Sequence, residues 1–138
     1  MFLTGFTDEA GSDFAVQLKA TRELGWKFME SRGINGKNLA TLTEGEFEAV
    51  AEQLHTAGIA INCYGSAVAN GGKSPRSEAD IRASYDELLR VLPRMRKLKI
   101  RLLRGMSFRP VENEAPDSPE LEEIIFRHVR RFVEMCAE

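Results

Sequence analysis

Four short apolar runs divide the chain into a repeated pattern of hydrophobic and polar positions. Each run is followed by a polar or glycine-rich segment and then by apolar residues at helical spacing; the runs are residues 1–6, 28–30, 59–64 and 100–104. Strands that alternate with helices are typical of βαβ units on a parallel sheet. The pattern therefore predicts an α/β fold of four βα units, half the number in a closed (β/α)8 barrel.

The first two helices are delimited by capping residues. Asp13 is a suitable N-cap for a helix whose apolar residues share one face, and Gly25 ends that helix in a position suited to a left-handed conformation. Thr43 and Glu46 have the spacing of a capping box, and Gly58 ends the helix that follows. These signals predict one helix between Asp13 and Gly25 and another between Thr43 and Gly58.

The third and fourth helices carry proline signals. The third begins near Ser77, and we expect Pro93 to kink or split it, because proline removes a backbone hydrogen bond inside a helix. The fourth opens with Ser118 and Pro119, a cap followed by proline at the first helical position. No low-complexity linker separates these helices, so we predict a single domain over residues 1–138.

Composition narrows the classes of function. The 138 residues are 43% hydrophobic and 29% charged, with a formal net charge of −2. This mild negative charge gives no general attraction to nucleic acid or to anionic membranes, whereas a small anionic substrate needs only a local site. We therefore expect no nucleic-acid partner and no membrane partner.

The cysteines and the N-terminus indicate a compartment. Cys63 and Cys136 lie in no metal-ligand spacing and suggest no disulfide framework, so a reducing, cytoplasmic setting fits best. Residues 1–5 show no basic region followed by a long apolar stretch, so we expect no signal peptide.

The ends of the predicted strands carry most of the candidate chemistry, because parallel sheets bind ligands beyond the carboxyl ends of their strands. Alternation along the strands predicts that five polar side chains face the mouth of the barrel: Glu30, Arg32, Asn62, Tyr64 and Arg104. Met29 and Cys63 are then expected to point the opposite way, toward the helix layer.

The strand-end segments resemble those of a known family. Gly-Phe-Thr-Asp-Glu-Ala, Met-Glu-Ser-Arg, Asn-Cys-Tyr-Gly-Ser and Arg-Gly-Met-Ser occur in this order with helices between them. This arrangement is similar to the N-terminal half of the sugar phosphate isomerase/epimerase family, which has the xylose isomerase-like TIM barrel fold. The resemblance covers essentially the whole chain. One departure is Lys99, where the family often has a helix-ending glycine.

The resemblance implies a function that this chain does not complete. Family members interconvert sugars by proton transfer between adjacent carbons and bind manganese, magnesium, zinc or cobalt through Glu, Asp or His on later strands. The sequence stops at Glu138, where a fifth strand with the first metal-binding glutamate would be expected. We therefore expect a divalent metal in the full-length protein, none bound by this half, and no isomerase activity from this half alone.

Glu30 and Arg32 admit two interpretations. At a barrel mouth, a glutamate can orient substrate hydroxyls, and an arginine can grip a carboxylate or phosphate with two hydrogen bonds. Alternatively, the two charges pair with each other or with loop residues as a surface salt bridge. The resemblance favours a substrate site formed by the five strand-end residues named above, with the catalytic residues unknown.

Other motifs are weaker. Residues 71–74 suggest a phosphate-binding loop, but the earlier glycine is replaced by Ala67 and Pro75 removes a donor. We expect a flexible loop across the barrel mouth, with a lid as one role open to it. Asp8 and Glu9 are adjacent and should point to opposite sides, so at most one of them can bind a cation or substrate.

Helical charges and histidines also have plain explanations. The basic segment at residues 94–101 could bind nucleic acid, as in the DNA-repair endonuclease branch of the same superfamily that acts at apurinic sites. Cations near a helix C-terminus complement its dipole, and we favour this explanation. His55 and His128 lie on helices and are expected to be solvated rather than metal ligands.

Two classes of function remain open. In the first, the chain is part of a metal-dependent sugar or sugar-phosphate isomerase or epimerase and pairs with the missing C-terminal half. In the second, it is a non-catalytic half-barrel or truncated product that associates with itself, because four strands leave unpaired sheet edges.

Overall fold

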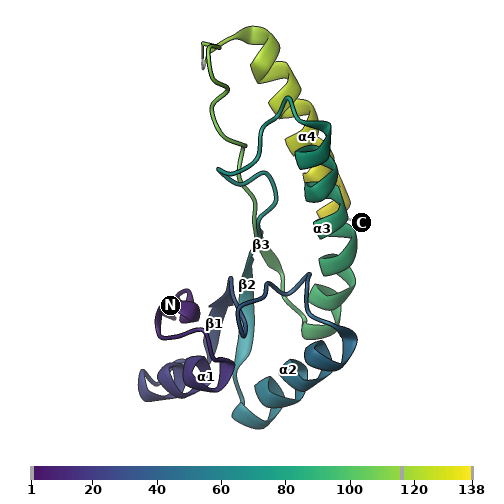
Figure 1. Ribbon diagram of the computed structural model, residues 1–138. Helices are drawn as coiled ribbons and strands as arrows, with labels where there is room; N and C mark the ends of the chain where they lie inside the picture. Colours follow the sequence, from purple (N-terminus) through teal and green to yellow (C-terminus); the bar gives the residue numbers. More distant parts are fainter. Residues whose placement is uncertain (1, 116, 138) are drawn as a thin grey trace. The chain divides into compact units, whose positions relative to one another are not determined.

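Helices and short parallel strands alternate along the chain. The structure is a computed structural model and describes residues 2–115 and 117–137. In chain order (Figure 1), its elements are η1 (Thr7–Glu9), α1 (Phe14–Glu23), β1 (Phe28–Ser31), α2 (Glu44–Ala57), β2 (Ala60–Gly65), α3 (Glu78–Leu98), β3 (Leu102–Arg104) and α4 (Pro119–Ala137). The α/β class predicted from the apolar runs is confirmed.

Two compact units share these elements. Unit 1 comprises Met1–Ser66 and Pro93–Arg104, and unit 2 comprises Ala67–Leu92 and Gly105–Glu138. Unit 1 contains the sheet with α1, α2 and the end of α3, whereas unit 2 contains the first part of α3 and all of α4.

The sheet of unit 1 has the strand order β1-β2-β3, with both pairs parallel. Over its described residues, 2–6, the first predicted strand forms only a single bridge: Phe6 pairs with Glu30, whose N–H donates to the Gly5 carbonyl at 2.9 Å. Phe2 and Leu3 are mostly exposed, so burial adds little to pairing along this segment. Met1 lies outside the described residues.

A register shift interrupts the pairing of β1 with β2. Met29 is aligned with Ile61, but the next residue of β1, Glu30, is aligned with Cys63. Asn62 is therefore the extra residue of a bulge. Because side chains alternate along a strand, one extra residue exchanges the faces of all residues that follow it on β2.

The exchange overturns one expectation about orientation. Tyr64 is aligned with Ser31 and is fully buried, so it does not face the mouth. Cys63 is aligned with Glu30 and shares its face, rather than pointing toward the helix layer. Strict alternation was wrong here because a bulge leaves no clear sign in a single sequence.

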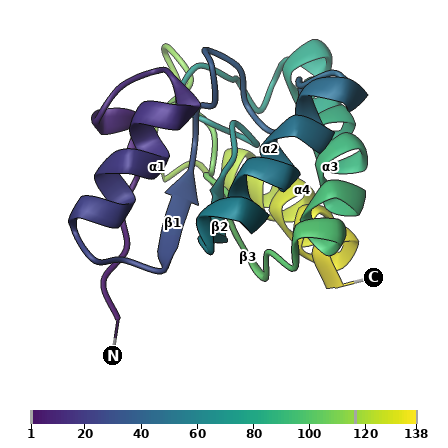
Figure 2. The ribbon, with the colours of Figure 1, turned by 90° about the horizontal axis from the view of Figure 1, so that it is seen from below.

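The core of unit 1 is built from the apolar faces of its helices and strands. Figure 2 shows the strands side by side, with α1 next to β1. The buried residues include Phe14 and Leu18 of α1, Phe47, Val50 and Leu54 of α2, and Met29 and Ile61 of the sheet. Burial of these side chains supplies most of the stabilisation of the unit.

The predicted N-caps of the first two helices are confirmed. Asp13 accepts a hydrogen bond from the Ala15 N–H at 2.7 Å, which satisfies a donor at the start of α1. In α2, the Thr43 N–H donates to Glu46 Oε2 at 2.7 Å, and the Glu46 N–H donates to the Thr43 hydroxyl at 3.3 Å. These two bonds complete the capping box.

Three helices end in the same way. Gly25, Gly58 and Lys99 follow α1, α2 and α3 in the left-handed region, with φ of 68°, 64° and 58°. After each of them, the next N–H donates to a carbonyl five residues earlier, at 3.0, 3.1 and 2.8 Å. The chain thus turns from helix to strand through one repeated geometry, in which a lysine replaces glycine at the third site.

Helix α3 continues through Pro93. It is one helix over Glu78–Leu98, so the expected split does not occur. Beyond Pro93, Arg94 donates to the Leu39 carbonyl at 2.7 Å, and Lys97 forms an ion pair with Glu48 of α2. Tertiary contacts of this kind can outweigh the hydrogen bond that proline removes. They also occupy two cations of the basic segment that could have suggested nucleic-acid binding.

In unit 2, α3 and α4 lie side by side (Figure 1) and share an aromatic cluster. The ring centroids of Tyr85 and Phe132 are 4.8 Å apart, and the Tyr85 hydroxyl is 3.1 Å from Nδ1 of His128. Burial and the nearby Arg127 hold the pKa of His128 below its usual value. His128 is therefore part of a packed cluster, contrary to expectation, whereas His55 is exposed as expected.

The loop that begins unit 2 is fastened to α3. Lys73 Nζ donates to the Ala67 carbonyl at 2.5 Å and lies 3.7 Å from Oε2 of the buried Glu87. The Ala67 N–H donates to Glu87 Oε1 at 2.8 Å. Lys73 is thus committed to an internal ion pair, so the expectation of a flexible loop is not supported.

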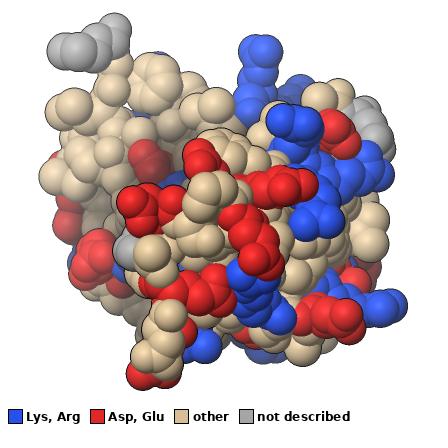
Figure 3. Space-filling view, turned by 90° about the horizontal axis from the view of Figure 1, so that it is seen from above, with Lys and Arg blue, Asp and Glu red and all other residues tan. Residues whose placement is uncertain are grey.

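The surface carries charges of both signs. In the face seen in Figure 3, lysine and arginine side chains lie among aspartate and glutamate side chains. Mixed charges of this kind are typical of solvated surfaces. None of the helices in the described residues is long and apolar enough to cross a membrane.

Candidate functional site at the strand ends of unit 1

Phe6 is the central side chain of the candidate site. It forms the bridge to Glu30, and an edge of its ring rests on Gly65, the last residue of β2. A Cβ atom added to Gly65 would lie 2.6 Å from Cε1 of Phe6 and 3.2 Å from its Cζ. Such distances are too short for carbon atoms, so glycine is required for the ring to sit there.

Two arginines lie over the Phe6 ring. The guanidinium carbon of Arg32 is 5.1 Å from the ring centroid, and that of Arg104 is 4.8 Å from it. Arg104 pairs with Gly65 on one side of β2, and Arg32 directly follows β1 on the other side. Stacking on an aromatic face attracts a cation and fixes the plane of its guanidinium.

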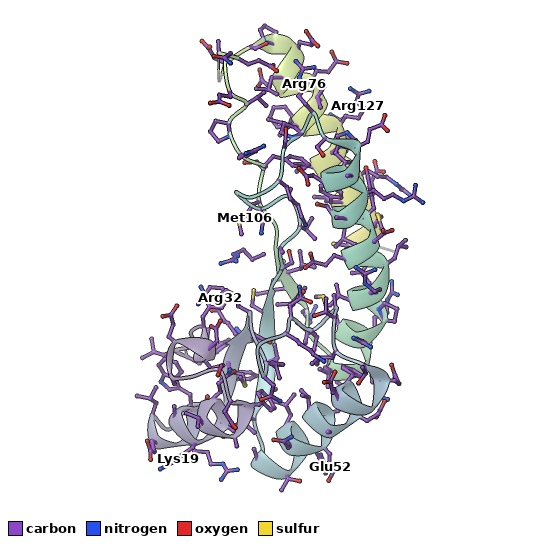
Figure 4. All side chains as sticks on the ribbon, in the orientation of Figure 1. Lys19, Arg32, Glu52, Arg76, Met106 and Arg127 are labelled. Carbon is purple, nitrogen blue, oxygen red and sulfur yellow. The ribbon has the colours of Figure 1, made fainter. Side chains whose placement is uncertain are left out.

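Arg32 is engaged by two carboxylates of η1. Its Nε donates to Asp8 Oδ2 at 2.8 Å, and a terminal nitrogen donates to Glu9 Oε1 at 2.7 Å. The hydrogen bonds that Arg32 donates to Asp8 and, next, to Glu9 raise the pKa of Arg32 above its usual value. Figure 4 shows Arg32 at the carboxyl end of β1. The salt-bridge interpretation of Arg32 therefore describes this structure.

Asp8 and Glu9 both reach Arg32, although we expected at most one of them to bind a cation. That expectation assumed an extended segment with alternating side chains. The residues instead belong to the 3-10 helix η1, where consecutive side chains diverge by about 120° rather than 180°. A short helix thus lets adjacent carboxylates converge on one guanidinium.

Arg104 has a different environment. In the described part of the chain, no carboxylate lies within ion-pair distance of its guanidinium, and its Nε is buried without a hydrogen-bond partner. The side chain as a whole is half-buried. Its carbonyl accepts a hydrogen bond from the Ser66 hydroxyl at 2.7 Å, which fixes the end of β3 against β2.

Glu30 and Arg104 have opposite effects on the pKa of Cys63. Burial, and next the charge of Glu30, raise the pKa of the Cys63 thiol; the Arg104 N–H and guanidinium oppose this rise. Opposite charges therefore flank the thiol on the face of the sheet that carries Phe6. Because its pKa is raised, Cys63 is a poor nucleophile in this environment.

The other two predicted residues have structural roles. Asn62, the bulge residue, accepts a hydrogen bond from the Thr4 hydroxyl at 3.1 Å and so anchors the N-terminal segment. Tyr64 is buried on the opposite face of the sheet. The structure thus brings Arg32 and Arg104 together over Phe6, with Glu30 bridged to Phe6 on the neighbouring strand, whereas Tyr64 lies on the other face.

Sequence reasoning missed Gln17, whose side chain connects the segments that carry the site. This fully buried side chain accepts a hydrogen bond from the Thr7 hydroxyl at 3.1 Å. Its Nε2 donates to the carbonyls of Gly11 and Gly33, each at 2.9 Å. Gln17 thus joins η1 to the loop after β1. An amide between Phe14 and Leu18 on the apolar face of α1 was the available signal.

The residues present do not fit a metal site. The described residues contain no group of three His, Cys, Asp or Glu side chains placed to hold a metal ion. Besides Glu30, the carboxylates beside the site are those of Asp8 and Glu9, which are already paired with Arg32. The arrangement can therefore orient a polar or anionic substrate, and no reaction step is assigned to a metal in this half.

Comparisons with known proteins support the fold. No protein-family model and no curated protein sequence matches the chain. Among solved structures, a xylose isomerase-like TIM barrel protein from Mycobacterium smegmatis in complex with magnesium is similar with a TM-score of 0.70 and 13% identity. The match covers 99% of this chain and 51% of that protein.

Two epimerases are also similar. D-psicose 3-epimerase with D-tagatose, from Clostridium cellulolyticum H10, has a TM-score of 0.68 at 17% identity, covering 99% of this chain and 49% of its own. L-ribulose 3-epimerase has a TM-score of 0.67 at 17% identity, covering 99% and 46%. The chain thus spans about half the length of these proteins. It therefore has the fold of half a xylose isomerase-like (β/α)8 TIM barrel.

Proposed function

We propose that this chain is part of a sugar or sugar-phosphate isomerase or epimerase that moves a proton between adjacent substrate carbons. The observation that carries the proposal is the stacking of Arg32 and Arg104 on Phe6, with Glu30 bridged to Phe6 on the neighbouring strand. This cluster lies at the carboxyl ends of parallel strands, where (β/α)8 barrels bind their substrates. Proteins of similar fold include D-psicose 3-epimerase and L-ribulose 3-epimerase, which supports this class.

The three charged residues have positioning roles in this proposal. Arg104 binds an acidic or hydroxyl oxygen of the substrate, and Glu30 accepts hydrogen bonds from substrate hydroxyls. Arg32, held by η1, keeps Phe6 in place beneath them. The groups that remove and return the proton, and the divalent metal expected for such enzymes, belong to the other half of the barrel. Both cysteines are free, in keeping with a cytoplasmic setting.

The first test uses the 138-residue chain by itself. We expect no incorporation of solvent deuterium into ketoses or ketose phosphates in the presence of manganese, magnesium, zinc or cobalt. Without a metal or a positioned base, the barrier to proton transfer keeps most of its height. NMR spectra of the sugars in deuterated water measure this directly. Metal-dependent exchange catalysed by this chain would contradict the proposal that the metal and the proton-transfer groups belong to the other half of the barrel.

The second test uses the protein in which the barrel is complete. Glu30→Ala and Arg104→Ala should lower kcat/KM on the order of 10- to 100-fold, because misplaced substrate loses productive orientation. Lys19→Ala is the matched control, since Lys19 is an exposed cation on α1 (Figure 4). Loss of stability with unchanged kinetics in the Glu30 and Arg104 variants would show that the cluster is only structural.

A second candidate is a half-barrel module that associates with itself. The open side of β3 favours it, because within the described part of the chain β3 pairs with β2 alone. The gene downstream of the Glu138 codon distinguishes the candidates. A continuing reading frame with acidic residues and histidines at strand ends supports the enzyme, whereas a stop codon supports the module.

A further inference from the structure

The geometry points to Arg104 as the anchor for a carboxylate of the substrate, so that the ligand is a singly charged sugar acid. This inference rests on the proposed function and narrows its substrate class. It begins from the difference between two arginines that stack on one ring. Arg32 has two carboxylate partners, and Arg104 has none in the described part of the chain.

The free hydrogen-bonding capacity lies on Arg104. Arg32 already uses Nε and one terminal nitrogen for Asp8 and Glu9. In Arg104, Nε is buried, but the terminal nitrogens are not among the buried unpaired atoms of the half-buried side chain. A planar guanidinium held on Phe6 presents those donors in a fixed plane, which suits a planar carboxylate.

The charge of the site limits how much negative charge the ligand can carry. Three carboxylates, those of Asp8, Glu9 and Glu30, accompany two guanidinium groups. The cluster therefore carries a net charge of −1 before a ligand binds; a ligand carboxylate has Arg104 as its direct partner and brings the net charge to −2. A phosphate dianion would bring the net charge to −3 on the face that carries Glu30, and its second negative charge would have no cationic partner of its own there. The site therefore discriminates by charge, and a neutral sugar would leave Arg104 unpaired.

Three hexoses that differ at one carbon test this inference on the 138-residue chain: D-glucuronate, D-glucose and D-glucose 6-phosphate. The probe is the Nε–H resonance of Arg104 in a nitrogen-15 NMR titration. We expect a saturable shift with glucuronate and affinity at least tenfold weaker for glucose 6-phosphate and for glucose. Raising the salt concentration should weaken glucuronate binding. Equal or tighter binding of either comparison sugar would overturn the inference.

Two variants distinguish a specific contact made by Arg104 from a general effect of positive charge. Arg104→Lys keeps the charge but loses the planar fork, so we expect about tenfold weaker glucuronate binding, read from neighbouring backbone amides. Arg101→Ala removes an exposed arginine three residues earlier and should leave binding unchanged. Equal losses in the two variants would overturn the inference. These titrations need no turnover, so their failure would leave the deuterium-exchange test of the proposed function standing.

Discussion

Gly65 sets the space available at the strand ends. The Phe6 ring occupies the position where any other side chain at residue 65 would begin. The two arginines are ordered by that ring, so the cluster depends on the absence of a single carbon atom. This dependence can be tested without knowing the substrate.

Gly65→Ala should displace the Phe6 ring and lower the free energy of unfolding by about 1–3 kcal/mol, because a well-packed site resists added volume. Urea unfolding measures the loss, and the Nε–H resonances of Arg32 and Arg104 report the altered ring position. Gly45→Ala is the control, since an added Cβ there would meet nothing within 4 Å. Gly45 lies in α2, so this control should gain about 0.5–1 kcal/mol.

Lys99 offers a second prediction for a single residue. Its φ of 58° is strained for any residue with a Cβ, whereas glycine adopts it freely. Lys99→Gly should raise the free energy of unfolding by about 1 kcal/mol in urea denaturation. Gly58→Ala, at the same position after α2, should lower it by a similar amount. A less stable Lys99→Gly protein would mean that the lysine side chain stabilises the fold by other contacts.

Among the elements, α2 shows what a sequence can predict. Its capping box and left-handed end depend on residues three to five positions apart, and both were predicted correctly from those residues alone. The bulge at Asn62 depends on how β1 aligns with β2, across more than thirty residues of chain, and it was missed. The faces of Cys63 and Tyr64 were wrong for that reason.

The candidate site was predictable only in part. Topology pointed to strand-end residues, and two of them, Arg32 and Arg104, stack on one ring. The ring itself was overlooked, because a phenylalanine in an apolar run carries no sign that it will lie between arginines. Of the two outcomes expected at Pro93, a kink or a split, the split does not occur, because α3 is one helix through that residue.

The start of α2 should also respond to pH. Its capping glutamate, Glu46, has a pKa lowered from its usual 4.5 to about 2, chiefly by Lys37 and next by the Thr43 N–H. A carboxylate with a depressed pKa stabilises the folded state at pH values above its pKa in the unfolded chain. That stabilisation is lost as pH falls from about 4.5 toward 2.

The wild type should therefore have a higher free energy of unfolding than Glu46→Gln at pH 7, and this difference should shrink through the acid range. Urea unfolding of both proteins at pH 7 and at pH 3 measures it. Glu52→Gln, an exposed position later in α2, is the control. A difference between wild type and Glu46→Gln that is independent of pH would contradict the titration of Glu46.

At the scale of the whole chain, unpaired backbone and exposed apolar residues predict association. The outer edge of β3 carries no strand within the described residues, and Leu102 is 59% exposed on the face that also carries Cys63. Such edges favour pairing with another chain. We propose that two copies, or this chain and the other half of a barrel, cover them.

Light scattering on the purified 138-residue chain tests this proposal. We expect a mass above that of one chain, and we expect Leu102→Lys to shift it toward the monomer, because a charge on that face opposes burial. Leu89→Lys, at an exposed leucine of α3, is the matched control. A wild-type chain that is monodisperse at the mass of one copy and unfolds cooperatively would rule the proposal out.

Segments of the two units alternate along the sequence, which determines when each unit can fold during synthesis. Unit 1 ends with Arg104, so its third strand leaves the ribosome only after the first part of unit 2, Ala67–Leu92, has already emerged. That part must in turn wait for Gly105–Glu138 before its own unit is complete. Neither unit can therefore finish folding as an uninterrupted N-terminal piece, and nascent chains halted before residue 104 should remain open to proteases and chaperones.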